Sequence, residues 1–207
     1  AMSIALVGCL IGAMTAGALA DRFGRKLLLS LAAFIFVASA YGTGCFSDFN
    51  LFLVARFFGG IGIGIASGLS PMYIAEVAPT NIRGRLVSLN QLTIVLGILA
   101  AQITNWLIAE PVIDNTIDTW NCQMGWRWMF WAGAFPAIAF LALSFFIPES
   151  PRWQILKGDL DHARNTIKRV YLLPADVEEQ VEASKKVSGG SDDSGNWRLL
   201  FTPGIFK

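Results

Sequence analysis

Charged residues and cysteines are scarce in this chain of 207 residues. Only 15% of the residues are Asp, Glu, Lys or Arg, and 16 basic residues nearly balance 15 acidic ones, giving a net charge of +1. This balance lacks the basic surface of a nucleic-acid-binding protein, so no nucleic-acid partner is expected. The 3 cysteines are too few and too scattered for a disulfide framework.

The residues that enzymes commonly use are also rare. His162 is the single histidine, and no Cys or carboxylate pattern around it suits a metal site or a catalytic triad. The glycine-rich stretch 59–64 lies in an apolar run, so it is not a phosphate-binding loop. The sequence therefore predicts neither an enzyme nor a bound metal or cofactor.

Apolar residues dominate instead, at 54% of the chain, and the mean hydropathy is +0.53. Five runs are close to the length of about 20 residues that crosses a bilayer as a helix. These predicted spans are 2–20, 27–46, 51–75, 86–109 and 128–147. We therefore expect an all-α membrane protein, with residues 1–147 forming five helices in a lipid bilayer.

Basic residues predict the orientation of these spans. One side of the membrane receives Arg22, Arg25, Lys26, Arg83, Arg85 and every Lys and Arg from Arg152 onward. The loops on the other side, 47–50 and 110–127, contain a single basic residue, Arg127. The basic side is expected to be cytoplasmic. The prediction is a multi-pass protein of the plasma or inner membrane, with residue 1 outside and the C-terminal segment in the cytoplasm.

The residues after the last span have a different character. Residues 148–187 are expected to form a cytoplasmic helical segment, because Leu160, Ala163, Ile167 and Val170 recur at helical spacing and 174–183 can form a second short helix. Residues 188–207 read as a Gly/Ser/Asp linker followed by the start of another apolar segment. Together with the odd number of spans and the absence of an initiating Met, this predicts a chain truncated at both ends.

Small residues recur every four positions in two of the spans. Gly60, Gly64 and Gly68 form such a row in the third span, and the first span has a similar row from Gly8 to Ala20. These rows predict helices that approach at backbone distance. Whether the glycines also serve gating, or packing alone, is left open by the pattern.

Arg56 is the only charged residue well inside an apolar run. A cation within the membrane is costly unless it faces a cavity or finds a partner, so a functional role is expected for Arg56. The alternative is that its side chain extends to the outer surface.

The fourth span offers candidates for a binding site. At about 100° per residue, Gln91, Ile98 and Gln102 lie on one face of a helix, with Ile94 beside them. An amide both donates and accepts hydrogen bonds, as a sugar hydroxyl does, so these side chains suit a neutral polyol. A hydrogen bond between helices is the alternative for both amides.

Charged residues at the inner ends of the spans form a third group. A carboxylate and a guanidinium can form forked pairs there, and such pairs could act as a latch that closes the inner side. A solvated rim of charges is the alternative. The candidate gate residues are Asp21, Arg25, Glu76, Arg83, Glu149 and Arg152.

Several stretches, in this order and at this spacing, resemble the sugar porter family of the major facilitator superfamily over essentially the whole chain. They are 17–26 (GALADRFGRK), 56–60 (RFFGG), 71–79 (PMYIAEVAP) with Arg83 and Gly84, 90–92 (NQL) and 148–153 (PESPRW). The resemblance implies the second to sixth helices of a twelve-helix transporter. Its first helix and its C-terminal half would then lie outside this chain.

The resemblance also implies a function. We expect transport of a monosaccharide, a hexose or a pentose, by alternating access, either as uniport or as proton symport. The matching positions imply that Gln91 contacts the sugar, that Ile94 and Ile98 line the cavity, and that Arg56 pairs with a carboxylate on the first helix in proton-coupled members. The alternatives are an antiporter of another small solute, a non-transporting sugar sensor and an inactive gene fragment.

Overall fold

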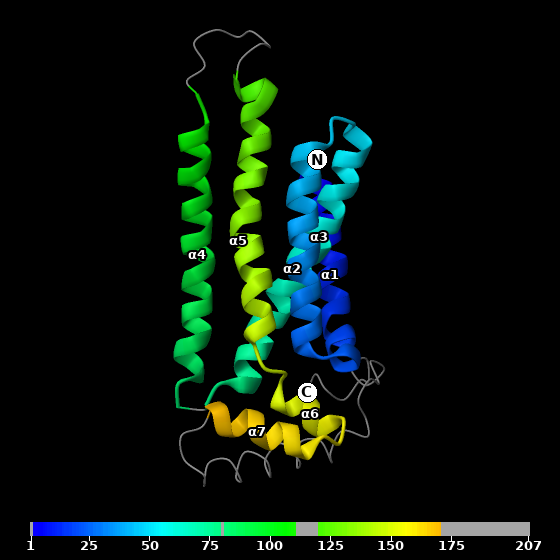
Figure 1. The fold of residues 1–207 in the computed structure, drawn as a ribbon, viewed down its shortest axis with the longest axis vertical. Helices are drawn as coiled ribbons and strands as arrows, with labels where there is room; N and C mark the ends of the chain where they lie inside the picture. The colour runs from blue at the N-terminus through cyan, green and yellow to red at the C-terminus, as the bar shows by residue number, and fades with distance from the viewer. Residues whose placement is uncertain (1, 80, 111–119, 171–207) are drawn as a thin grey trace, which may run out of the picture. The chain divides into compact units, whose positions relative to one another are not determined.

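The structure, a computed structural model, describes residues 2–79, 81–110 and 120–170, and these residues form helices without strands (Figure 1). Contacts divide the chain into two compact units, residues 1–150 and 151–207, which are described separately. The helices are α1 (Met2–Phe23), α2 (Arg25–Cys45), α3 (Phe49–Val77), α4 (Arg83–Ile108), a π-helix (Asn121–Gly125), α5 (Trp126–Phe146), α6 (Pro151–Leu156) and α7 (Leu160–Val170).

The first unit is a set of long apolar helices, α1 to α5, that run alternately up and down (Figure 1). Each is long and apolar enough to cross a membrane, with a mean hydropathy of 1.7 to 2.0 over its most apolar stretch. Each of the five predicted spans overlaps one of these helices. The expected all-α fold with five apolar helices is therefore confirmed.

The small-residue rows of α1 and α3 face each other. A methyl group added at Gly8 would overlap the carbonyl oxygen of Phe57, and one added at Gly64 would overlap the carbonyl oxygen of Cys9. Gly60 meets the carbonyl oxygen of Ala5 in the same way. The two parallel helices thus touch through their backbones, as the spacing of the glycines predicts.

A small apolar core continues this contact and includes α2. Its buried members come from α1, α2 and α3, and they are Ala16, Ala20, Leu28, Leu29, Ala32, Ile65 and Leu69. On another face, α2 lies against α5, where the hydroxyl groups of Ser30 and Ser144 are hydrogen-bonded at 3.0 Å. Polar contacts of this kind join helices in an apolar setting, where an unpaired hydroxyl would be costly.

The fourth helix differs from the others because none of its residues is buried. It stands beside α5 at the edge of the first unit (Figure 1). The start of α5 also differs from the prediction, since helical structure resumes at Trp120 rather than at 128. The Asn121 side chain accepts a hydrogen bond from the backbone N–H of Glu110 at 3.0 Å and donates one to its carbonyl oxygen at 2.7 Å. These bonds satisfy the Asn121 amide, so this polar residue is accommodated in a helix.

The described part of the second unit consists of α6 and α7. Of the predicted apolar stripe of α7, Ala163 and Ile167 are buried, whereas Leu160 is 42% exposed. The hydroxyl group of Thr166 donates a hydrogen bond of 3.2 Å to Gln154 of α6. The helix predicted at 174–183 and the segment 188–207 lie outside the described residues.

Candidate functional site

The buried guanidinium of Arg25 organises the end of the first unit where α1 ends and α2 begins. Its side chain is only 2% exposed. Nε and Nη2 donate to the two carboxylate oxygens of Glu76, at 3.0 and 3.1 Å, and Nη2 also donates to Asp21 at 2.9 Å. Nη1 donates to the carbonyl oxygen of Ala20 at 3.0 Å. This planar, forked pairing matches the geometry of a guanidinium and is stronger than a bond between neutral groups.

The carboxylate of Glu149 lies at the N-terminus of α2. It accepts hydrogen bonds from the backbone N–H groups of Arg25 at 2.8 Å and Lys26 at 3.1 Å. Gly24 permits this approach, because its φ of 94° is unfavourable for residues with a side chain and because a side chain there would meet the Glu149 carboxylate. A negative charge at this position is stabilised by the unpaired N–H groups and the dipole of α2.

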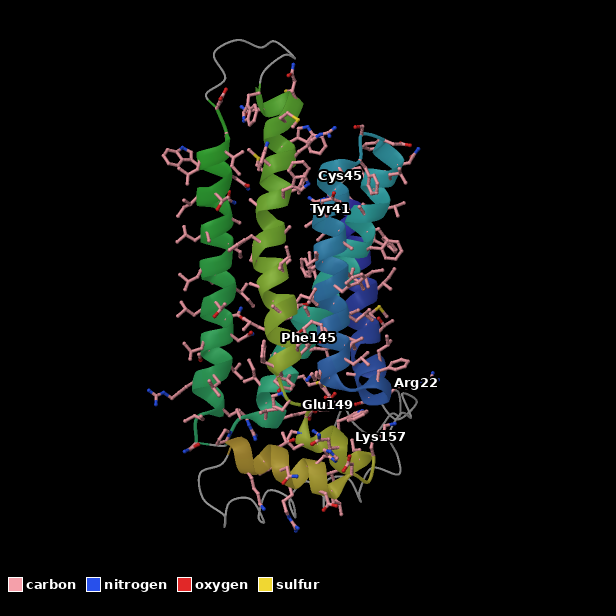
Figure 2. All side chains as sticks on the ribbon, viewed as in Figure 1. Arg22, Tyr41, Cys45, Phe145, Glu149 and Lys157 are labelled. Atoms are coloured by element: carbon pink, nitrogen blue, oxygen red, sulfur yellow. The ribbon has the colours of Figure 1, made fainter. Side chains whose placement is uncertain are left out.

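Two further hydrogen bonds connect the residues after α5 to α3. The hydroxyl group of Ser150 donates to Glu76 at 2.5 Å, and the hydroxyl group of Tyr73 donates to the carbonyl oxygen of Pro148 at 2.8 Å. In Figure 2, Glu149 and Phe145 lie at the same end as Arg22, whereas Tyr41 and Cys45 lie at the opposite end. The Arg25 cluster, defined as Asp21, Arg25, Glu76, Glu149 and Ser150, thus joins α1, α2, α3 and the segment after α5.

The structure brings four of the six predicted gate residues into this cluster and leaves two outside it. Arg83 donates to the carbonyl oxygen of Ala78 at 3.3 Å, and its buried Nε has no partner among the described residues. Arg152 is exposed on α6 in the second unit. Glu149 was expected to pair with a basic side chain, but in the described chain its hydrogen bonds go to backbone N–H groups.

The sequence analysis missed two members of this arrangement, Ser150 and Tyr73. Both lie close in sequence to predicted residues, since Ser150 follows Glu149 directly and Tyr73 precedes Glu76 by one helical turn. That spacing was the available signal. It shows which residues share a surface, but not that a hydroxyl group reaches a carboxylate from another helix.

The predicted binding residues of α4 all lie on a helix without buried positions. Gln91 and Gln102 are exposed, and Ile94 and Ile98 are 47% and 59% exposed. Neither amide has a hydrogen-bond partner within the described residues. This face of α4 is therefore open to a ligand or to a segment outside the described chain, and its two amides can donate and accept hydrogen bonds there.

Arg56 lies in the first half of α3, toward the end of the helix opposite the Arg25 cluster. Its guanidinium carbon lies 4.5 Å from the centroid of the Phe130 ring of α5. The Nε atom is buried and has no hydrogen-bond partner among the described residues. The structure thus gives Arg56 an aromatic neighbour that the sequence analysis did not identify.

Comparison with known proteins places this arrangement in a family. A family model described as "Sugar (and other) transporter" matches residues 1–204, almost the whole chain. The chain belongs to the sugar porter family of the major facilitator superfamily. The resemblance found in the motifs is thereby confirmed, and the family consists of transporters rather than enzymes.

Individual sugar porters are similar to this chain over most of its residues. The "Glucose transport protein" of Synechocystis sp. is 41% identical over 181 residues, which cover 86% of this chain and 39% of that protein. The "D-xylose-proton symporter" of Escherichia coli K12 is 39% identical over 219 residues, covering 97% of this chain and 44% of that protein. The chain therefore spans less than half the length of these relatives.

A solved sugar porter has a similar fold. The structure of a proton:xylose symporter bound to 6-bromo-6-deoxy-D-glucose matches with a TM-score of 0.86 and 35% identity, covering 98% of this chain and 46% of that one. Together with the apolar helices, this similarity indicates a multi-pass membrane protein.

Proposed function

We propose that the full-length protein carrying these residues transports a monosaccharide across a membrane by alternating access, as a uniporter or a proton symporter. The observation that carries the proposal is the match to sugar transporters along nearly the whole chain, at up to 41% identity for the relatives described above. Those relatives are named for glucose and for xylose with protons, so a hexose or a pentose is the expected substrate. In this proposal, residues of α4 would bind the sugar, and the Arg25 cluster would close the cytoplasmic side.

The face of α4 that carries Gln91, Ile94, Ile98 and Gln102 is the proposed sugar site. Gln91 and Gln102 would exchange hydrogen bonds with sugar hydroxyl groups, and Ile94 and Ile98 would line the apolar part of the cavity. The exposure of all four side chains supports this assignment, because a ligand site needs groups that the protein itself has not paired. Arg56 would serve proton coupling if the protein is a symporter.

The Arg25 cluster is the proposed latch of the cytoplasmic side, with Arg83 and Arg152 as further gate residues. Its support is that separate helices meet there through charge-assisted hydrogen bonds, which can form in one state and break in another. The cluster would lie at the cytoplasmic face of the plasma or inner membrane, with the segment after α5 in the cytoplasm, as the distribution of basic residues suggests.

Substitution of Gln91 tests the sugar site. Gln91→Ala in the full-length protein should leave a sugar hydroxyl without its partner, which costs roughly 1–3 kcal/mol of binding and lowers affinity about tenfold or more. The measurement is the uptake of D-xylose and D-glucose into proteoliposomes. Leu89→Ala, on a nearly opposite face of α4, is the control.

The outcomes of this experiment separate the alternatives. Uptake that rises with an inward proton gradient indicates symport, and uptake that ignores it indicates uniport. Sugar binding without uptake would indicate a sensor. The absence of both would contradict sugar transport and leave an antiporter of another solute or an inactive gene product. Equal losses for Gln91→Ala and Leu89→Ala would show that Gln91 has a packing role only.

A further inference from the structure

An aromatic cluster joins α3 to α5 at the end opposite the Arg25 cluster. It consists of Phe52, Trp126 and Phe130, and each ring lies edge to face against the other two. The ring centroids are 6.0 to 6.2 Å apart, and the planes are inclined by 69° to 78°. This is a favourable arrangement for aromatic rings, and each ring restricts the rotation of its neighbours.

Arg56 lies one helical turn after Phe52, as Phe130 lies one turn after Trp126. The guanidinium is therefore presented to α5 at the level of Phe130, with its central carbon 4.5 Å from the ring centroid. That distance is within the range of a cation–π interaction, which is about 6 Å. The held ring thus fixes the position of the guanidinium on the α5 side.

The charge of Arg56 has no acidic partner among the described residues. The carboxylates of the described first unit, which are Asp21, Asp48, Glu76, Glu110 and Glu149, form no ion pair with it. Its buried Nε is also without an acceptor in this part of the chain. Among the described residues, the Arg56 guanidinium is therefore stabilised by the ring face of Phe130. Its Nε–H remains available to donate a hydrogen bond.

We propose that Phe130 is a positioning residue for Arg56: the ring holds the guanidinium by its π face, so that the unpaired Nε–H is directed toward the group that it bonds during transport. The role in transport rests on the proposed function, whereas the Phe130–Arg56 contact does not depend on it. Phe52 and Trp126 hold the ring through their T-shaped contacts with it. The arrangement predicts that Phe130 matters through Arg56 and not through general packing.

A double-mutant cycle tests this dependence in the full-length protein. Phe130→Leu should lower the rate of sugar uptake by about threefold to thirtyfold, the effect expected for the loss of one cation–π contact. Phe130→Trp should preserve uptake, because it keeps a π face. In the Arg56→Gln background, Phe130→Leu should cause no further loss, since the cation is already absent. Equal losses with and without Arg56 would overturn the proposal.

Chemical modification tests the contact without relying on transport. Phenylglyoxal reacts with guanidinium groups, and the rate at Arg56 can be followed by mass spectrometry with the exposed Arg22 as an internal standard. Phe130→Leu should accelerate modification at Arg56 several-fold, and Phe130→Trp should not. Phe135→Leu, the same change at an 80% exposed position of α5, is the matched control.

The two measurements distinguish failure of the inference from failure of the proposed function. If the wild-type protein takes up no sugar but Phe130→Leu still exposes Arg56, the positioning contact stands and the transport function is wrong. If modification of Arg56 is unchanged, the contact does not hold the guanidinium and the inference is wrong. Should Phe130→Leu not fold, Phe130→Met supplies another side chain without a ring and is judged by the same outcomes.

Discussion

Neutralising the two carboxylates around Arg25 one at a time should give very different losses of stability. Both accept hydrogen bonds from the same guanidinium, but their surroundings differ. The Glu76 side chain is 5% exposed and accepts from Nε, Nη2 and the Ser150 hydroxyl group. The Asp21 side chain is 65% exposed and accepts a hydrogen bond from Nη2. Glu76→Gln and Asp21→Asn are thus a matched pair.

The magnitudes follow from burial. In Glu76→Gln, an amide N–H₂ group replaces an acceptor oxygen, so the buried Arg25 charge loses its buried anion and keeps only the exposed Asp21 carboxylate. Breaking a buried pair from one side costs about 3–5 kcal/mol, because the remaining charge stays buried. The solvent-screened Asp21 carboxylate offsets little of this cost. Asp21→Asn removes a solvent-screened pair, for which about 1 kcal/mol or less is expected. The predicted difference is therefore at least about 2 kcal/mol.

The assay is reversible unfolding of the full-length protein in mixed micelles, with the free energy of unfolding obtained for the wild type and both variants. A third variant, Glu76→Asp, keeps the charge but shortens the reach, and it should fall between the other two. Equal losses for Glu76→Gln and Asp21→Asn would refute the argument, since they would mean that burial does not determine the strength of the Arg25 pairs. A gain in stability for Glu76→Gln would refute it more strongly.

Further predictions concern packing, backbone geometry and pH. Gly8→Leu should overlap the backbone of α3 and destabilise the protein by about 1–3 kcal/mol or more, whereas Gly17→Leu on the same helix meets open space and should be tolerated in the same unfolding assay. Gly24→Ala should destabilise the start of α2, because its φ is 94°, and should increase hydrogen exchange there. His162 hydrogen-bonds to Asp159 and lowers the pKa of that carboxyl group. A lowered carboxyl pKa stabilises the folded state above the ordinary carboxyl pKa, and this stabilisation is lost as the pH falls through the lowered pKa. His162→Ala removes the hydrogen bond, so an NMR titration should show the pKa of Asp159 raised toward its ordinary value.

The features that follow from local periodicity were predictable from the sequence. The five apolar runs and the glycine rows depend on spacing along one helix, and the backbone contact of Gly8 with α3 and of Gly64 with α1 confirms the interpretation of those rows. The same holds for Ala163 and Ile167 of α7, which are buried, but not for Leu160 at the start of that helix, which is exposed. In each case one helix carries the whole signal.

The features that depend on a partner from another helix were not predictable in this way. Glu149 was expected to pair with a basic side chain, but the turn at Gly24 presents two backbone N–H groups that the carboxylate reaches first. Similarly, Phe130 has no charge to mark it as a neighbour of Arg56, because an aromatic residue in a membrane helix resembles any other apolar residue in sequence. Such contacts arise from the register between helices, which the periodicity of one helix does not specify.

The proposed sugar site and the Arg25 cluster lie on different parts of the first unit, which constrains how one can influence the other. The Arg25 cluster joins α1, α2, α3 and the residues after α5, whereas α4, which carries Gln91, has no residue in it. The start of α4 is instead connected to the end of α3, because the backbone N–H and the guanidinium of Arg83 donate to the carbonyl oxygens of Pro79 and Ala78. A change in the Glu76 pairing would therefore have two routes to α4. One is this connection from α3, and the other is α5, which lies beside α4 and is followed by the segment that carries Glu149 and Ser150 (Figure 1).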